Sequence, residues 1–287
     1  MHLVTVRHEC AHEVHRLVRG DAARHAHDNE HGPILPRGVG GEVTSSVCTV
    51  IVHVPPSAAP GETAAPVRLL AVRDEDPARA WDPLGAWWPD QPGVIGVRDR
   101  RAGGAWLAAD PAAGALAVIL NRADVAVDGD APLASRGRLV LDAVAGRPPI
   151  TPPPTHGFNL VEVTAGGAAV TMWDGSSLRR ADLGPGIHMI AHDDVDDPRT
   201  ARIAAWGDAF DAPAADDENW RERWLDTLER TSVLAPVDDR AIVRDNRPYG
   251  YPTLSLLVCA ASVDASGVDV RYGEFAEPGA WNRPVLR

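Results

Sequence analysis

The sequence predicts a protein of the α+β class, and three observations lead to this prediction. Short stretches with the character of β-strands follow one another in runs, separated by Gly, Asp and Pro turns. Segments with helical spacing are grouped between these runs, so strict alternation of strand and helix is not expected. The chain has 287 residues and is 45% hydrophobic, which is enough for a sizeable core in one large domain or two small ones.

Strand-like segments dominate the first half of the chain. The first is VCTVIVHV at residues 47–54, and a long turn leads to the second, VRLLAVRDED at 67–76. Three more short strands are expected at 93–99, 105–110 and 114–123. A helix is predicted within 131–146, where apolar residues recur at helical spacing and Gly146 provides a C-terminal stop.

A proline-rich connector at 147–157 introduces the second half of the chain. Further strands are expected at 158–164, 168–175 and 186–192. Two helices with acidic starts are predicted at 197–210 and 216–230. The chain then closes with a predicted pair of strands at 252–263 and 268–276.

The charge of the chain argues against two classes of partner. The net charge is -12 and the pI is near 5.3, so neither a nucleic acid nor an anionic membrane surface is expected to bind. No apolar run approaches the roughly 18–20 residues of a membrane span, and no secretory signal is visible. The cysteines Cys10, Cys48 and Cys259 show no paired spacing, which fits a reducing cytoplasm better than a disulfide framework.

Residues 1–46 differ in composition from the rest of the chain. They show neither a strand nor a helix period, and they are expected to form a His-rich, disordered extension before a single domain at 47–287. Of the eleven histidines, seven lie in this extension: His2, His8, His12, His15, His25, His27 and His31.

Three explanations of the extension compete. It is a propeptide cut between Val47 and Cys48, or a permanent part of the protein, or the product of a wrongly assigned start. Val47 can be encoded by GTG, a bacterial start codon, and the composition of 1–46 fits translated non-coding DNA. The third explanation is therefore favoured.

The stretch HECAH at 8–12 matches the zinc-protease pattern H-E-x-x-H. On a helix, His8 and His12 would share one face, Glu9 would act as the base and His15 could add a third ligand. However, nothing precedes the motif that could form a supporting sheet, and three fixed positions also match by chance in a His-rich segment. A zinc site is therefore only a remote alternative, and no metal or other cofactor is expected.

Cys48 stands at the head of the first predicted strand, a position that suits a nucleophile. A thiol needs a base to become a thiolate, and the α-amine of a chain that begins with cysteine can supply one, because its pKa is about 7.7–8.0. Cys48 followed directly by TVIVHV fits this design if residue 47 and everything before it are removed.

Several blocks of the sequence resemble the NRDE family, which includes the transport and Golgi organisation proteins. The resemblance covers roughly residues 47–276, and its ordered blocks are VRDE at 72–75, GGAWLA at 103–108, LN at 120–121, SRG at 135–137 and HGFNL at 156–160. The family is similar to the N-terminal-nucleophile hydrolases. The resemblance therefore implies a four-layer αββα sandwich of that type.

The resemblance also implies roles for individual residues. Cys48 would be the nucleophile, and Arg73 would favour its thiolate through a fixed positive charge. Asp74 would bind the freed amine or orient Arg73, with Asp76 as the rival for that role. Asn121 could donate its side-chain amide to an oxyanion.

Three positions depart from the family pattern. Val72 replaces the Asn that begins the family signature, His192 replaces an Asn before a Pro, and Pro252 replaces an Arg near the end. A proline cannot supply the charge of an arginine, so these departures bear on the chemistry more than on the fold.

Two functions are therefore expected as alternatives. The first is a cysteine-dependent hydrolase of a small amide, and the second is a non-catalytic binder or carrier of a small hydrophobic, lipid-like or haem-like ligand on the same fold. A homo-oligomer is possible in either case. Residues expected to line a binding pocket are Trp87, Trp88, Trp106, Asn159 and His192.

Overall fold

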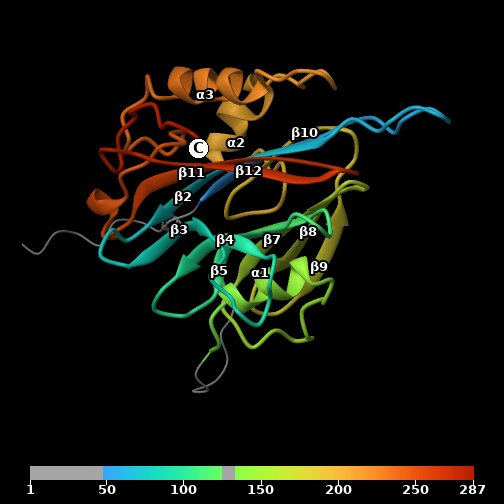
Figure 1. Ribbon diagram of the computed structural model, residues 1–287. Coiled ribbons are helices and arrows are strands. Elements are labelled where there is room, and N and C mark those ends of the chain that lie inside the picture. The colour runs from blue at the N-terminus through green and yellow to red at the C-terminus, as the bar shows by residue number, and fades with distance from the viewer. Residues whose placement is uncertain (1–47, 125–132) are drawn as a thin grey trace, which may run out of the picture. The chain divides into compact units, whose positions relative to one another are not determined.

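The computed structural model describes residues 48–124 and 133–287, and these form two antiparallel sheets with few helices (Figure 1). The α+β class predicted from the sequence is confirmed. The first sheet has five strands in the order β10-β1-β2-β11-β12. Its strands are β1 (Thr49–Val54), β2 (Val67–Glu75), β10 (Gly186–Ile190), β11 (Leu254–Asp264) and β12 (Gly267–Glu274).

The second sheet has seven strands that follow one another in chain order from β3 to β9. Each strand pairs with the next in antiparallel register. The connection from β6 to β7 is long and contains a helix at Gly137–Val144. The strands are β3 (Trp81–Gly85), β4 (Ile95–Asp99), β5 (Ala105–Asp110), β6 (Ala115–Asn121), β7 (Phe158–Thr164), β8 (Gly167–Trp173) and β9 (Leu178–Asp182).

Strand alternation divides the apolar residues of the five-stranded sheet between two cores. In β1, Val50 and Val52 face the seven-stranded sheet, whereas Ile51 between them faces the helices on the other side. In β2, Leu69 and Leu70 divide in the same way. Successive side chains of a strand point to opposite faces. All six residues of β1 are buried, so this strand is covered on both faces.

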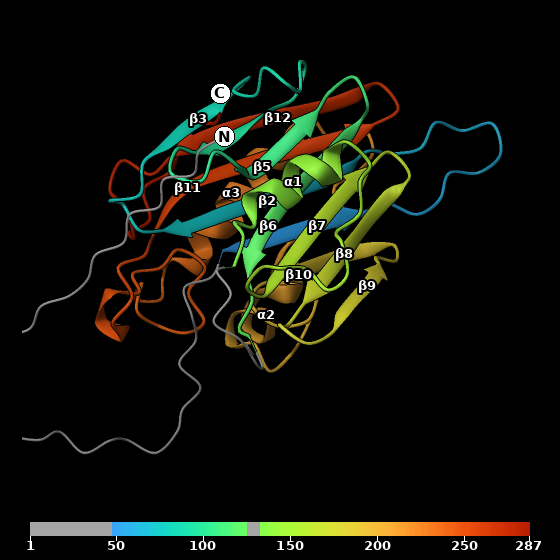
Figure 2. The same ribbon diagram turned by 90° about the horizontal axis from the view of Figure 1, so that it is seen from below.

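Helices cover the outer faces of both sheets (Figures 1 and 2). Helix α1 (Gly137–Val144) lies across β5, β6 and β7 and buries Val140, Leu141 and Val144. Helices α2 (Ala201–Trp206) and α3 (Trp220–Thr231) lie on the five-stranded sheet, where Trp220 and Trp224 are almost fully buried. The layers therefore run in the order helix, sheet, sheet, helix.

Two strands of the seven-stranded sheet were not predicted from the sequence. Both β3 and β9 lie at sheet edges, where only one side needs backbone partners. Strand β3 contains Pro83, which is tolerated at an edge because a proline has no N–H to pair. Strand β9 reads LRRAD and has no apolar alternation.

The predicted helices are present but shorter than expected. In the segment 197–210, α2 begins only at Ala201, because Thr200 before it still has an extended backbone, and a short 3-10 turn at Gly207–Ala209 follows Trp206. The segment 216–230 starts with a turn, and α3 begins at Trp220. A second short 3-10 turn lies at Arg247–Tyr249. The extension at 1–46 lies outside the described residues.

Candidate functional site

Cys48 lies immediately before β1 and is buried against the core between the two sheets. Its Sγ donates a weak hydrogen bond to the main-chain oxygen of Asp74, at 3.8 Å. Thr49 pairs with Val72, so Cys48 lies beside the end of β2. The thiol is therefore held next to the acidic end of that strand.

A cavity of about 660 Å³ opens beside this thiol. Its wall is formed by the ends of β2 and β6 and by the starts of β5 and α1. It brings together five of the residues singled out in the sequence: Cys48, Arg73, Asp74, Trp106 and Asn121. These residues lie up to 73 positions apart in the chain (121 minus 48), and the pairing of the strands gathers them.

Arg73 spans the space between the two sheets at the cavity. Its side chain is only 3% exposed, and its Nη2 donates to Glu75 Oε2 at 3.2 Å. The guanidinium lies 5.8 Å from the centroid of the Trp106 ring on β5, within the range of a cation–π contact. Its charge acts on Cys48 to lower the pKa of the thiol.

Asp74 carries its carboxylate to the opposite face of the five-stranded sheet, because neighbouring residues of a strand point in opposite directions. There Ser255 Oγ donates to its Oδ1. Burial raises the pKa of Asp74 to about 6, although the charges of Arg202 and Arg244 and the Ser255 hydrogen bond act in the other direction. Asp74 therefore does not orient Arg73, whose partner is Glu75.

The pKa of Cys48 is raised to about 12. Burial is the main cause and the negative charge of Asp74 the next, while the hydrogen bond to the Asp74 carbonyl and the charge of Arg73 oppose them. A thiol with this pKa is almost entirely protonated at neutral pH. Reaction at Cys48 therefore needs a base.

Arg136 and His156 are among the residues at the cavity that were not recognised as site residues from the sequence. Arg136 lies at the start of α1, and its Nη1 donates to the carbonyl of Gly157 at 2.8 Å. His156 pairs through Nδ1 with Asp124 Oδ2 at 2.6 Å. The signal was present, since Arg136 belongs to the SRG block and His156 to the HGFNL block.

Two buried arginines on the helix side of the five-stranded sheet were missed as well. Arg202 of α2 donates from Nη1 to Thr49 Oγ1 at 2.8 Å, and burial lowers its pKa to about 10. Arg244 is held by Asp239 and by Asn246 Oδ1, the latter at 3.0 Å. Both contribute positive charge close to Asp74. Nothing in the local sequence around either arginine marks it as a partner of β2.

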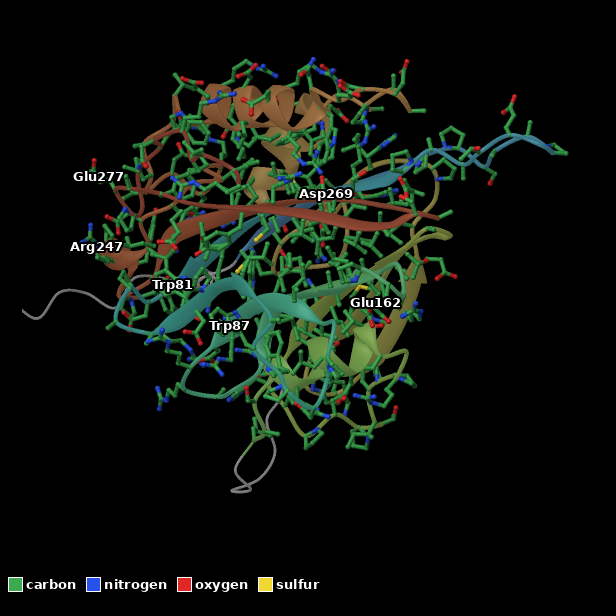
Figure 3. All side chains as sticks on the ribbon, in the orientation of Figure 1. Trp81, Trp87, Glu162, Arg247, Asp269 and Glu277 are labelled. Atoms are coloured by element: carbon green, nitrogen blue, oxygen red, sulfur yellow. The ribbon has the colours of Figure 1, made fainter. Side chains whose placement is uncertain are left out.

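Three predicted residues lie elsewhere. Asp76 accepts the backbone N–H of Ala78 at 2.8 Å in the turn after β2. Trp88 is buried in the core and donates to the Gly103 carbonyl at 2.8 Å. Trp87 lies in the region of β3 and β4, with the guanidinium of Arg98 5.4 Å from its ring centroid (Figure 3). The structure does not bring these residues to the wall of the cavity.

Asn159 and His192 lie between layers and outside the cavity wall. Asn159 is fully buried, and its Nδ2 donates to the carbonyls of Ala191 and Asp193 at 2.9 and 2.8 Å. It thereby ties β7 to the loop after β10. His192 lies in that loop, 3.3 Å from Asp193 Oδ2, and lines a separate cavity of about 230 Å³ on the helix side.

The other two departures from the family pattern have different surroundings. Val72 is buried in the core beneath α2 and α3. Pro252 is exposed in the loop before β11. Arg202 and Arg244 supply positive charge near Asp74, although neither stands at position 252.

No group of three or more His, Cys, Asp or Glu side chains suited to a metal ion is found in residues 48–124 and 133–287. The HECAH motif, with His8, Glu9, His12 and His15, lies outside the described residues. Within the described part of the chain, no helix is long and apolar enough to cross a membrane.

The family model described as Transport and Golgi organisation 2 matches residues 48–241. The match begins at Cys48 and includes all the residues of the cavity wall named above. No curated protein sequence matches the chain.

Proposed function

As the chain belongs to the transport and Golgi organisation 2 family, we propose that it is a cysteine amidohydrolase of the N-terminal-nucleophile type that acts on a small amide. One observation carries the proposal. The thiol of Cys48, placed directly before a central strand, borders a cavity of about 660 Å³ together with Arg73 and Asn121. That volume is in the range of small-molecule sites.

The first half of the proposed reaction acylates Cys48. The freed α-amine of Cys48 takes the thiol proton, and the thiolate adds to the amide carbonyl. Asn121, exposed at the end of β6 on the cavity wall, donates its side-chain amide to the oxyanion that forms. The C–N bond then breaks, the ammonium returns its proton to the leaving amine, and a thioester remains.

The second half releases the acid. Water gives one proton to the amine and attacks the thioester carbonyl. The C–S bond breaks, the thiolate regains the proton, and the free carboxylic acid leaves. Arg73 favours the thiolate in both halves through its charge.

The amine can act as a base only when no residue precedes Cys48. A peptide bond to Val47 removes the basic nitrogen, and a thiol pKa of about 12 then leaves almost no thiolate at neutral pH. The proposal therefore requires a form of the protein that begins with Cys48.

A chain with a site-specific protease sequence in place of the residues just before Cys48 tests this requirement. We expect the cleaved protein to hydrolyse members of a panel of N-acyl amino acids and simple amides, and the uncleaved protein to be inactive. Intact-mass spectrometry checks the N-terminus. It also detects the acylated enzyme, whose mass is increased by that of the acyl group. Cleaved Cys48→Ala is the control, and turnover by that variant at the wild-type rate would refute the proposal.

A second candidate is a non-catalytic carrier of a small hydrophobic ligand. It is favoured by the raised pKa of the thiol and by the apolar part of the wall, formed by Trp106, Ile119 and Leu133. Binding of the neutral fluorophore N-phenyl-1-naphthylamine, equal in wild type and Cys48→Ala and without amide turnover in either, would favour this candidate.

A further inference from the structure

We propose that the cavity beside Cys48 binds a carboxylate group of its ligand through two buried donors, Arg73 Nη1 and Trp106 Nε1. The inference rests on the proposed function, because it names the substrate class of the same site. Under it, the substrates are amides that carry a carboxylate near the scissile bond.

Both donors are buried without an acceptor among the described residues. Arg73 is 3% exposed and Trp106 is 6% exposed, and both line the cavity. A buried N–H that has lost water without gaining another acceptor is destabilising, and more so when the donor is charged. Two such donors at one cavity indicate that an acceptor outside the described residues completes them, and a bound ligand can supply it.

The donors come from opposite sheets and lie close together. Arg73 is on β2 and Trp106 on β5, and their side chains are stacked at 5.8 Å. The other end of the guanidinium is already engaged, since Arg73 Nη2 donates to Glu75. Arg73 Nη1 and Trp106 Nε1 are the buried donors of this pair without a partner, and two N–H donors match the two oxygens of a carboxylate.

The charges around the cavity favour an anion, although the whole chain is acidic. The carboxylates at the wall already have partners. Glu75 forms an ion pair with Arg73, and Asp99 forms one with Arg79. Asp74 accepts a hydrogen bond from Ser255 on the far face of the sheet. Arg136 has the Gly157 carbonyl as its hydrogen-bond acceptor, and Arg101 adds a further cation at the wall. A local excess of positive charge draws an anionic ligand into a cavity.

Alkylation of Cys48 tests the inference without a known substrate. Iodoacetate and iodoacetamide both react as the thiolate displaces iodide, but only iodoacetate carries a carboxylate. Their rate ratio therefore does not depend on the fraction of thiolate. In the folded full-length chain we expect the iodoacetate-to-iodoacetamide ratio at Cys48 to exceed that of the same residue in urea by about tenfold, with saturation in iodoacetate and competition by acetate.

Matched variants assign the effect to the two donors. Trp106→Phe keeps the ring but removes its N–H, and Trp87→Phe makes the same change away from the cavity. We expect Trp106→Phe to lower the ratio at least about threefold, Arg73→Gln to abolish the preference, and Trp87→Phe to leave it unchanged. Peptide mass spectrometry reads the label at Cys48, and circular dichroism checks each fold.

The outcomes separate this inference from the proposed function. Equal labelling by both reagents, or a ratio that Trp106→Phe leaves unchanged, overturns the carboxylate site and leaves the amidohydrolase standing. A clear preference in a protein whose cleaved form hydrolyses no amide supports the carboxylate site and refutes the enzyme. If neither reagent reaches Cys48 in the folded full-length chain, the carboxylate site is refuted, and the amidohydrolase is decided by the assay of the cleaved protein.

Discussion

Cys48 and Cys259 place the same side chain in two different settings of one sheet. Both are buried free thiols that face the core between the sheets. Cys259 lies in the middle of β11, paired with Ala71 on one side and Tyr272 on the other, and is fully buried. Cys48 lies at a strand start and borders a cavity.

The comparison shows that burial alone does not distinguish a core thiol from a site thiol. Burial is the main cause of a raised pKa at both cysteines. What differs is the neighbourhood, since Cys48 borders a space large enough for a ligand, whereas apolar side chains such as Leu257 and Ala261 surround Cys259. Three experiments test this difference between the two thiols.

The largest expected effect is on chemical labelling. With iodoacetamide in native buffer, we expect Cys48 to react faster than Cys259 by about a thousandfold. Reaching Cys259 requires opening of core strands, which costs several kcal/mol. Quantitative peptide mass spectrometry over a time course measures both rates. Comparable rates would mean that the cavity does not expose Cys48.

The next effect is on stability. We expect Cys259→Ser to lower the free energy of unfolding by about 1–3 kcal/mol, because a hydroxyl is costly to bury among apolar side chains. Cys48→Ser should cost less than about 1 kcal/mol, since its hydroxyl lies beside the Asp74 carbonyl and the cavity. Urea unfolding followed by fluorescence compares the two variants. A larger loss of unfolding free energy for Cys48→Ser than for Cys259→Ser would contradict the difference proposed between the two thiols.

The smallest effect concerns the reactivity of Cys48 itself. Asp74 raises the pKa of the thiol and Arg73 lowers it, so Asp74→Asn should shift the alkylation profile to lower pH and Arg73→Gln to higher pH. At fixed pH we expect each rate to change by about tenfold or less. The pH dependence of iodoacetamide labelling measures both shifts. Shifts of the same sign would exclude an electrostatic origin.

The sequence predicted those parts of the fold that local pattern determines. The boundaries of β5 and β7 agree with the predicted segments, because their burial is nearly continuous and turns flank them. The edge strands β3 and β9 were missed, because an edge strand is stabilised by its neighbour more than by its own composition. When the partner of a strand lies far along the chain, the sequence of the strand itself does not reveal the pairing.

The same reason explains which site residues could be anticipated. Cys48, Arg73 and Asn121 stand at strand ends, and strand ends on one side of a sandwich meet in space. Trp87 and Trp88 were singled out because they are aromatic. Residue type alone does not show which layer of the fold a side chain enters. Arg202 and Arg244 reach the neighbourhood of Asp74 only through the packing of distant segments against β2.

Strand β2 presents a cation to one layer and a carboxylate to the other from two consecutive residues, Arg73 and Asp74. A one-residue insertion within the strand would exchange the two faces and leave an acidic cavity and an arginine facing Arg202. The exposed turn at 56–64 carries no such constraint, and its length can vary at small cost. Length variation among relatives should therefore be concentrated in that turn and be absent from the nine residues of β2.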